Sequence, residues 1–290
     1  EETYYKNYKK LMLIPIFIVI ISLIILINPQ IKTGDIMIKD ISLKGGISAT
    51  ITLQQQIDLN ELESKLSDDF PNNKFVIRQL TELGSQETTG VIIETDTSEE
   101  QSLKSSLEKI LNIELTIENY SYNLTSSIIG QSFYNQMLKA ILFTFILMFI
   151  VITIAYRTIV PSLAVIEAPL SNMILTLAVL NVLQIPVSIA GISALLLAIG
   201  YSVDTDVLLT TRLLRRQDES SRFEKLVTSF KTGFTMTLTA IAALLVGYIV
   251  TNSIVLREMF FVLIICLSMD VLSTYLMNAG ILIWYLERKK

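Results

Sequence analysis

The 290-residue sequence contains no histidine and a single cysteine, Cys266. The absence of histidine excludes Ser-His-Asp and Cys-His catalytic arrangements, as well as metal sites built on imidazole. One cysteine cannot form a disulfide within the chain, and the sequence has no Gly-rich phosphate loop of the P-loop type. We therefore expect no enzymatic activity, no cofactor and no bound metal, and the net charge of −4 gives no reason to expect a nucleic-acid partner.

Charged residues are also scarce, at 17% of the chain, whereas hydrophobic residues make up 51% and the mean hydropathy is +0.55. This composition is too apolar for an ordinary soluble domain. Stretches long and apolar enough to cross a bilayer are predicted at 11–27, 137–156, 159–183, 187–211, 232–251 and 257–286. The sequence therefore predicts an α-helical membrane protein with six transmembrane helices. No small-x-small cleavage pattern follows the first stretch, so we expect residues 1–28 to remain as an anchor.

Basic residues predict the orientation of these spans. They gather before the first span, between the second and third, between the fourth and fifth, and after the sixth. If the spans alternate in direction, all four places fall on one side, which the positive-inside rule makes the cytoplasm. We therefore expect both termini to be cytoplasmic. The basic residues are Lys6, Lys9, Lys10, Arg157, Arg212, Arg215, Arg216, Arg222, Lys225, Lys231, Arg288, Lys289 and Lys290.

The segment 29–136 is predicted to form a separate extracytoplasmic domain, followed by a five-helix membrane domain over 137–290 with a cytoplasmic loop over 212–231. The residue patterns of segment 29–136 follow the order β-α-β-β-α-β, which is typical of a ferredoxin-like α+β fold. The segment carries sixteen acidic and eight basic residues, a net charge of −8 that favours a solvated acidic face over a basic partner. Strands are predicted over 42–53, 74–80, 90–96 and 113–122, and helices over 58–70 and 98–111.

Four acidic residues lie within the predicted spans, where an ionisable group costs ~2.5–3.5 kcal/mol on insertion scales. Asp204 precedes Arg212 by eight residues, which places it ~12 Å from the end of its span. Glu167 lies at a similar depth in the third span, Asp206 is nearer the end of the fourth, and Asp270 is near the middle of the sixth. Buried acids of this kind are typical of proton relays.

Asp204 and Asp206 are two residues apart, so they point about 200° away from each other on a helix and cannot form a carboxylate pair. Asp204 shares its face with Gly200, which lets another backbone approach closely. We therefore expect Asp204 to be the deep functional acid. Asp206 is expected to be more peripheral, where it caps a helix, pairs with a basic residue or meets another subunit.

Two interpretations stay open for the polar residues of the spans. Lys231 and Thr232 lie at the cytoplasmic mouth of the fifth span, in reach of a proton pathway. Either these groups and the acids form a relay, or they are hydrogen-bonded contacts that hold the helices together. The structural interpretation is favoured for Glu167 and Asp270, and the functional one for Asp204.

The stretch GYSVDTDVLLTTR, with Gly200, Tyr201, Ser202 and Arg212, supports a family resemblance that covers nearly the whole chain. One span, a domain and five further spans with this motif on the fourth span is similar to the SecF family of protein-export membrane proteins. That family's motif reads Gly-Tyr-Ser-x-Asn-Asp-Thr-x-Val and ends in Asp-Arg. The family's aspartate aligns with Thr205, so the acid has moved by one residue, which rotates it by about 100°.

Two further motifs of the family resemble segments of this chain in altered form. Its Phe-x-Gly-Gly is similar to the segment that ends in Gly45 and Gly46, and its Arg-Thr aligns with Lys231 and Thr232. The lysine keeps the charge of the arginine but not its planar fork. These departures are typical of a divergent, archaeal-type member.

The resemblance implies a fold of the resistance-nodulation-division (RND) superfamily in the cytoplasmic membrane of a prokaryote, with its surrounding lipids. It implies a SecD-like membrane subunit and the Sec translocon channel as partners, and unfolded preproteins as substrates. It also implies coupling to the proton motive force, which supplies ~2.3 kcal/mol per proton at 100 mV. We expect exposed strand edges within 41–53 or 113–121 to pair with the unfolded chain.

Two alternative functions are kept. In the first, the chain is half of a small-molecule or lipid exporter of the same superfamily, although the domain over 29–136 is small for a ligand cavity. In the second, it is a non-conducting scaffold of the translocon. Export that is insensitive to Asp204→Asn and to collapse of the proton gradient would favour the scaffold.

Overall fold

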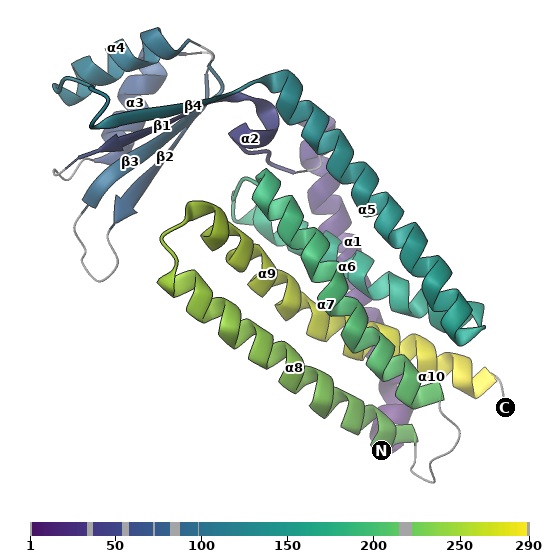
Figure 1. Ribbon diagram of the computed structural model, residues 1–290. Helices are drawn as coiled ribbons and strands as arrows, with labels where there is room; N and C mark the ends of the chain where they lie inside the picture. The colour runs from purple at the N-terminus through teal and green to yellow at the C-terminus, as the bar shows by residue number, and fades with distance from the viewer. Residues whose placement is uncertain are drawn as a thin grey trace. The chain divides into compact units, whose positions relative to one another are not determined.

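The computed structural model describes residues 2–33, 37–53, 58–71, 73–81, 88–97, 99–214 and 222–288. Two compact units are present, which Figure 1 draws as ribbons. The membrane unit comprises Glu1–Ile38 and Met137–Lys290, and the α+β unit comprises Lys39–Gln136. Part of the positive charge that predicts orientation, at Arg215, Arg216, Lys289 and Lys290, lies outside the described residues.

Six helical segments among the described residues are long and apolar enough to cross a membrane, as predicted. The predicted loop over 212–231 is too long, because the helices on either side continue to Leu214 and from Arg222. The first helix likewise runs to Thr33 rather than ending at residue 28. The helices are α1 (Glu2–Thr33), α5 (Ser127–Tyr156), α6 (Ile159–Val182), α7 (Ile189–Leu214), α8 (Arg222–Val250), α9 (Ile254–Leu272), the π-helix η1 (Ser273–Asn278) and α10 (Ala279–Arg288).

The centre of the membrane unit is formed by α6, α7 and the sixth span, which consists of α9, η1 and α10. About half of the most apolar window of α6 and of α7 is buried, whereas α5 and α8 are exposed along most of their length. An apolar helix surface suits lipid as well as protein. The buried polar residues of the spans belong mainly to the central helices.

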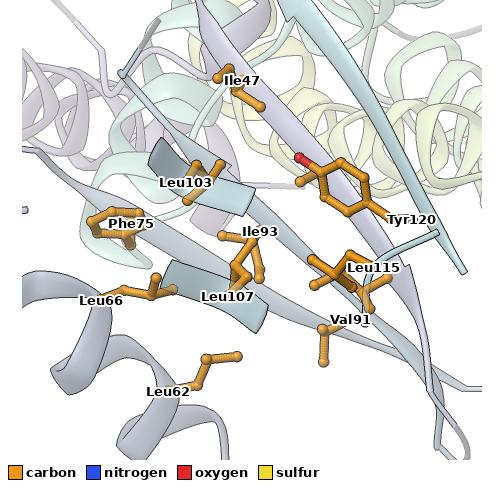
Figure 2. Close-up of a cluster of buried hydrophobic side chains, with 12 residues drawn as sticks. Ile47, Leu62, Leu66, Phe75, Val91, Ile93, Leu103, Leu107, Leu115 and Tyr120 are labelled. Atoms are coloured by element: carbon orange, nitrogen blue, oxygen red, sulfur yellow. The ribbon is translucent and has the colours of Figure 1, made fainter. Parts of the chain in front are cut away.

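The α+β unit has the predicted order of elements: β1 (Gly46–Thr52), α3 (Leu59–Asp69), β2 (Phe75–Thr81), β3 (Thr88–Thr95), α4 (Glu100–Leu111) and β4 (Tyr120–Thr125). The strands form one antiparallel sheet in the order β2-β3-β1-β4. Both helices cover the same face of the sheet, and alternate strand residues meet their leucine stripes in one core. Figure 2 shows this core, which includes Ile47, Ile93, Leu62, Leu66, Leu103 and Leu107.

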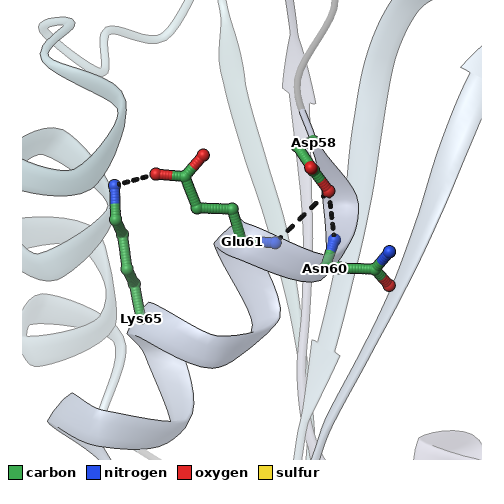
Figure 3. Close-up of polar contacts among 4 residues, drawn as sticks. All are labelled: Asp58, Asn60, Glu61 and Lys65. Carbon is green, nitrogen blue, oxygen red and sulfur yellow. Dashed lines mark hydrogen bonds and ion pairs between the residues drawn. The ribbon is translucent and has the colours of Figure 1, made fainter.

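The start of α3 shows why the sequence begins a helix there. Asp58 accepts hydrogen bonds from the backbone N–H groups of Asn60 at 2.9 Å and Glu61 at 3.4 Å, which satisfies two donors of the first turn. One turn further on, Lys65 and Glu61 form an exposed ion pair at 2.7 Å (Figure 3). These contacts are local, and for this reason the sequence predicts the helix well.

The strand predicted over 42–53 begins too early. Asp40 instead caps a short helix, α2 (Ile41–Lys44), and β1 starts only at Gly46. The backbone of Gly45 has a φ of 85° and that of Gly46 a φ of 138°, which only glycine adopts readily. A Cβ at Gly46 would also overlap the carbonyl oxygen of Thr95 on β3. The two glycines are therefore needed to join α2 to the sheet.

The strand predicted over 113–122 also begins too early. Asn119 forms a turn in which its Oδ1 accepts from the N–H of Thr116 at 2.7 Å and its Nδ2 donates to the carbonyl of Glu114 at 2.9 Å. This local bonding competes with strand pairing, so β4 begins at Tyr120.

Candidate functional site

A carboxylate with donors from three helices lies at the centre of the membrane unit. Asp270 on α9 is almost completely buried. Its Oδ1 accepts hydrogen bonds from Asn172 Nδ2 on α6 at 2.6 Å, Ser202 Oγ on α7 at 2.5 Å and Thr274 Oγ1 on η1 at 3.3 Å. Its Oδ2 accepts from Thr205 Oγ1 on α7 at 2.9 Å. These donors replace the water that a carboxylate loses on burial.

Asn172 links the helices around this carboxylate and was not predicted. Its Nδ2 also donates to Ser202 at 2.8 Å, and its Oδ1 accepts from the hydroxyl of Ser273 on η1. An amide in an apolar helix needs hydrogen-bond partners as a charged group does, so an asparagine near the middle of the third span was the available signal.

The second buried acid of the site is Asp206 on α7, which is fully enclosed. Its Oδ1 accepts from Asn278 Nδ2 on η1 at 2.7 Å, whereas its Oδ2 has no hydrogen-bond partner among the described residues. Other buried polar atoms on the same helices are equally unpartnered within the described chain, among them Thr210 Oγ1, Tyr275 Oη and Asn278 Oδ1. Asp206 also interacts electrostatically with Asp270. The two acids thus differ sharply in how well they are hydrogen-bonded.

The prediction that Asp204 is the deep acid and Asp206 the peripheral one is wrong. Asp204 is exposed, together with Gly200 and Tyr201 on the same face of α7. Ser202 and Asp206 share the opposite face, which packs against α6 and the sixth span. The prediction that the two acids lie on different faces of the helix is correct, but the face predicted to be buried, with Asp204, is the exposed one.

The remaining residues predicted for the fourth and fifth spans meet at one end of the helices. Arg212 on α7 donates through Nη1 to the hydroxyl of Thr232 on α8 at 3.1 Å. The neighbouring Lys231 is exposed. Arg212 and Thr232 therefore join the two helices, whereas the Lys231 side chain lies outside this contact.

Glu167 on α6 does not hydrogen-bond to the other acids. Its Oε1 accepts from Ser171 Oγ, one turn along the same helix, at 2.5 Å. Its Oε2 is buried and has no partner among the described residues. Glu167 thus lies beside the network of Asp206 and Asp270 without belonging to it.

A glycine on α8 makes room for an aromatic side chain beside the two acids. The hydroxyl of Tyr275 on η1 lies against the backbone of Gly233, and a Cβ at that position would overlap it. Gly200 differs, because no atom lies within 4 Å of the place where its Cβ would be. The predicted role of Gly200 in close helix contact is therefore not met within this chain.

The π-helix η1 concentrates these contacts. It contributes the buried residues Ser273, Thr274 and Asn278 to the hydrogen-bond network around the acids, and Tyr275 is buried on the same turn. Single π-helical turns within longer helices are frequent at functional sites, because they re-aim side chains that an α-helix would separate. Among the described residues, no group of three or more His, Cys, Asp or Glu side chains could hold a metal ion. The arrangement suits proton exchange between buried polar groups.

The fold and the site define a polytopic membrane protein with a buried acid and amide network in its helices and an α+β domain between its first two spans. The family model "Protein export membrane protein SecD/SecF, C-terminal" matches residues 105–288. The chain is 36% identical to the protein-export membrane protein SecF of Methanothermobacter thermautotrophicus over 97% of this chain and 94% of that protein. It is 34% identical to SecF of Methanocaldococcus jannaschii over 97% and 96%. The chain belongs to the SecF family of protein-export membrane proteins.

The fold is also similar to a solved structure of SecDF, a translocon-associated membrane protein from Thermus thermophilus. The TM-score is 0.76 at 17% sequence identity, with 98% of this chain covered. The chain spans 38% of that SecDF chain. This similarity concerns the fold, and it extends over both units of the chain.

Proposed function

We propose that this chain is a SecF-like subunit that works with a SecD-like subunit to assist protein translocation through the Sec channel. Its coupling to the proton motive force is proposed to run through Asp206 and Asp270. The observation that carries this proposal is the pair of fully buried, differently bonded acids in the centre of the membrane unit.

The difference between the two acids supports a division of roles. Asp270 accepts hydrogen bonds at both oxygens, which favours a permanent charge held in place. Asp206 has an unpartnered Oδ2 and lies on the helix that also carries the unpartnered Thr210 hydroxyl. A proton on Oδ2 would remove the cost of a poorly solvated charge and supply a donor for such an acceptor. We therefore assign proton uptake and release to Asp206.

The residues around the pair are proposed to serve the same coupling. Arg212 and Thr232 join α7 to α8, and through this contact a movement of α7 that follows a change of charge on Asp206 would be transmitted to α8. Lys231 is exposed beside them and would mark the cytoplasmic mouth of the path. Glu167, partly buried on α6 with its Oε2 unpartnered among the described residues, would be a further proton-accepting position.

The exposed face of α7 is proposed to contact the SecD-like subunit. A carboxylate on a transmembrane helix is costly against lipid, and Asp204 stands exposed beside Tyr201 and Gly200. A partner helix with a basic or hydrogen-bonding residue would satisfy it, and Gly200 would allow close approach. With both termini in the cytoplasm, the α+β unit lies outside, where no ATP is available and the proton gradient is the energy source.

Protein export into proteoliposomes tests this function. The chain, its SecD-like partner and the channel are reconstituted, and export is measured with and without a proton gradient. We expect Asp206→Asn to abolish the stimulation by the gradient, since an amide cannot carry the proton, while the complex still assembles. Asp204→Asn is the matched control on the same helix, and it should weaken co-purification of the partner instead. Export stimulated equally in wild type and Asp206→Asn would refute coupling through Asp206, and gradient-independent export would favour a scaffold.

A further inference from the structure

Among the described strands, the two outer ones, β2 and β4, differ in how their edges are protected. At one edge, β2 carries Arg78, which forms an ion pair with Glu94 on β3 at 3.2 Å, and its pairing is irregular between Leu80 and Thr81. Charges and bulges of this kind prevent an edge from pairing with another strand. At the other edge, β4 reads YSYNLT, with no charged residue and no proline. The β4 edge therefore lacks these protections.

The hydrogen-bond register shows which groups of β4 face outward. The N–H of Thr52 donates to the carbonyl of Asn119, and bonded pairs alternate along an antiparallel ladder. Ser121 and Asn123 are therefore bonded to β1, and the N–H and C=O groups of Tyr122 and Leu124 point away from it. The N–H of Tyr120 fits this register, because it bonds outward to the carbonyl of Thr116.

The side chains of the outward-facing residues are exposed as well. Tyr122 is 48% exposed and Leu124 is 53% exposed. Both lie on the same face of the sheet as the buried Tyr120, which packs in the core beneath the helices. Ile117, in the turn before β4, is completely exposed. The edge thus combines free backbone groups with apolar side chains at alternate positions, which is the pattern that strand addition uses.

We propose that the β4 edge, residues Tyr120–Thr125, binds an extended segment of an unfolded polypeptide as an added antiparallel or parallel strand. The proposal rests on the proposed export function, and the occupant is the chain that crosses the membrane. The expectation that 41–53 offers such an edge is wrong, since β1 is paired on both sides, and within 113–121 only the start of β4 belongs to the edge.

Two features of the unit favour an unfolded chain over a folded partner. Backbone pairing reads no particular sequence, so it suits substrates of many sequences. The surrounding unit is acidic, with fifteen Asp and Glu against seven Lys and Arg over Lys39–Gln136, a net charge of −8. An uncharged segment flanked by basic residues is therefore the preferred occupant.

Hydrogen exchange on the full-length chain in nanodiscs tests the proposal. The probe is a synthetic peptide of about eight residues, a typical strand length, with alternating Val and Thr and a lysine at each end. We expect the peptide to slow amide exchange in 120–125 and to leave β2 unchanged. The same peptide with alternate backbone nitrogens methylated should give no protection, because its hydrogen-bonding edge is blocked.

Two substitutions at one position separate backbone pairing from side-chain contact. Leu124→Pro removes an outward N–H while keeping the ladder to β1, and it should weaken peptide binding about tenfold. Leu124→Ala keeps the N–H and should weaken binding less. Equal binding by wild type and Leu124→Pro, or equal binding of the methylated peptide, would overturn the proposal. Unchanged exchange in β1 and β3 serves as the check that the Leu124→Pro variant is folded.

The outcome is separable from that of the proposed function. Peptide binding is measured without a membrane potential, so its failure leaves the coupling through Asp206 untouched. Conversely, peptide protection should persist in Asp206→Asn. If a co-purified SecD-like subunit protects 120–125 and the peptide then adds nothing, the edge is a subunit interface and the proposal is wrong.

Discussion

Asp206 on α7 and Asn278 on the π-helix η1 are joined by a hydrogen bond of 2.7 Å in the fully buried interior of the membrane unit. The bond crosses between the fourth and sixth spans. It satisfies one carboxylate oxygen of Asp206, and the other oxygen, Oδ2, has no hydrogen-bond partner among the described residues. This hydrogen bond therefore joins η1 directly to α7.

Exchanging the two residues separates their bond from the position of the acid. In the double variant Asp206→Asn with Asn278→Asp, a carboxylate and an amide still face each other, so thermal stability should return close to wild type. Stimulation of export by the proton gradient should stay lost, because the acid has left α7. Thermal unfolding in detergent and gradient-driven export measure the two effects. Recovery of stimulation in the double variant would show that only the pair matters.

Removal of the Asp270 carboxylate should destabilise the membrane unit strongly. Asp270→Ala removes the acceptor that Asn172, Ser202 and Thr205 share. Asn172 and Thr205 keep their bonds to Ser202, but the Ser202 hydroxyl loses its acceptor, and a buried unsatisfied group costs about 1–3 kcal/mol. The midpoint of thermal unfolding in detergent should fall by several degrees. Asp204→Ala is the control and should change it little, because Asp204 is exposed. Equal midpoints for the two variants would contradict the network.

Gly233→Ala should be destabilising because its methyl group overlaps the Tyr275 hydroxyl, an overpacking effect of about 1–3 kcal/mol. The additional substitution Tyr275→Phe removes that hydroxyl and should recover part of the loss. Gly200→Ala, which meets no neighbouring atom, should leave the isolated chain as stable as wild type. Thermal unfolding of the four proteins provides the measurement, and a harmless Gly233→Ala would show that η1 adjusts freely.

The α+β unit should lose stability at alkaline pH through Tyr120. Burial, and then the negative charge of Glu100, raise the pKa of this tyrosine to about 12. Because the pKa is higher in the folded state than the unfolded value of about 10, protonated Tyr120 contributes fully to the free energy of unfolding below about pH 10. This contribution is lost as the pH rises through about 12. Tyr120→Phe should reduce the alkaline loss of near-UV circular dichroism between about pH 10 and about pH 12, the range set by these two values. A variant with the same alkaline profile as wild type would assign the loss to other groups.

The elements that the sequence predicts well are those whose causes are local. The six spans follow from the length of apolar runs, and α3 from its capping aspartate and leucine stripe. The order of strands and helices in the α+β unit follows from alternation and helical periodicity in the same way. The early strand starts were wrong where Asp40 and Asn119 bond to nearby backbone, a competition that hydrophobic patterns do not register.

The sequence by itself determined that Asp204 and Asp206 lie on opposite faces of one helix, because the helical period fixes that angle. It did not determine which face is inside. Lipid and the protein interior are both apolar, so the hydropathy of α7 does not distinguish the face that packs against protein from the face that meets lipid. Only the tertiary structure, which brings Asn172, Asp270 and Asn278 from two other spans against α7, decided that Asp206 is the buried acid.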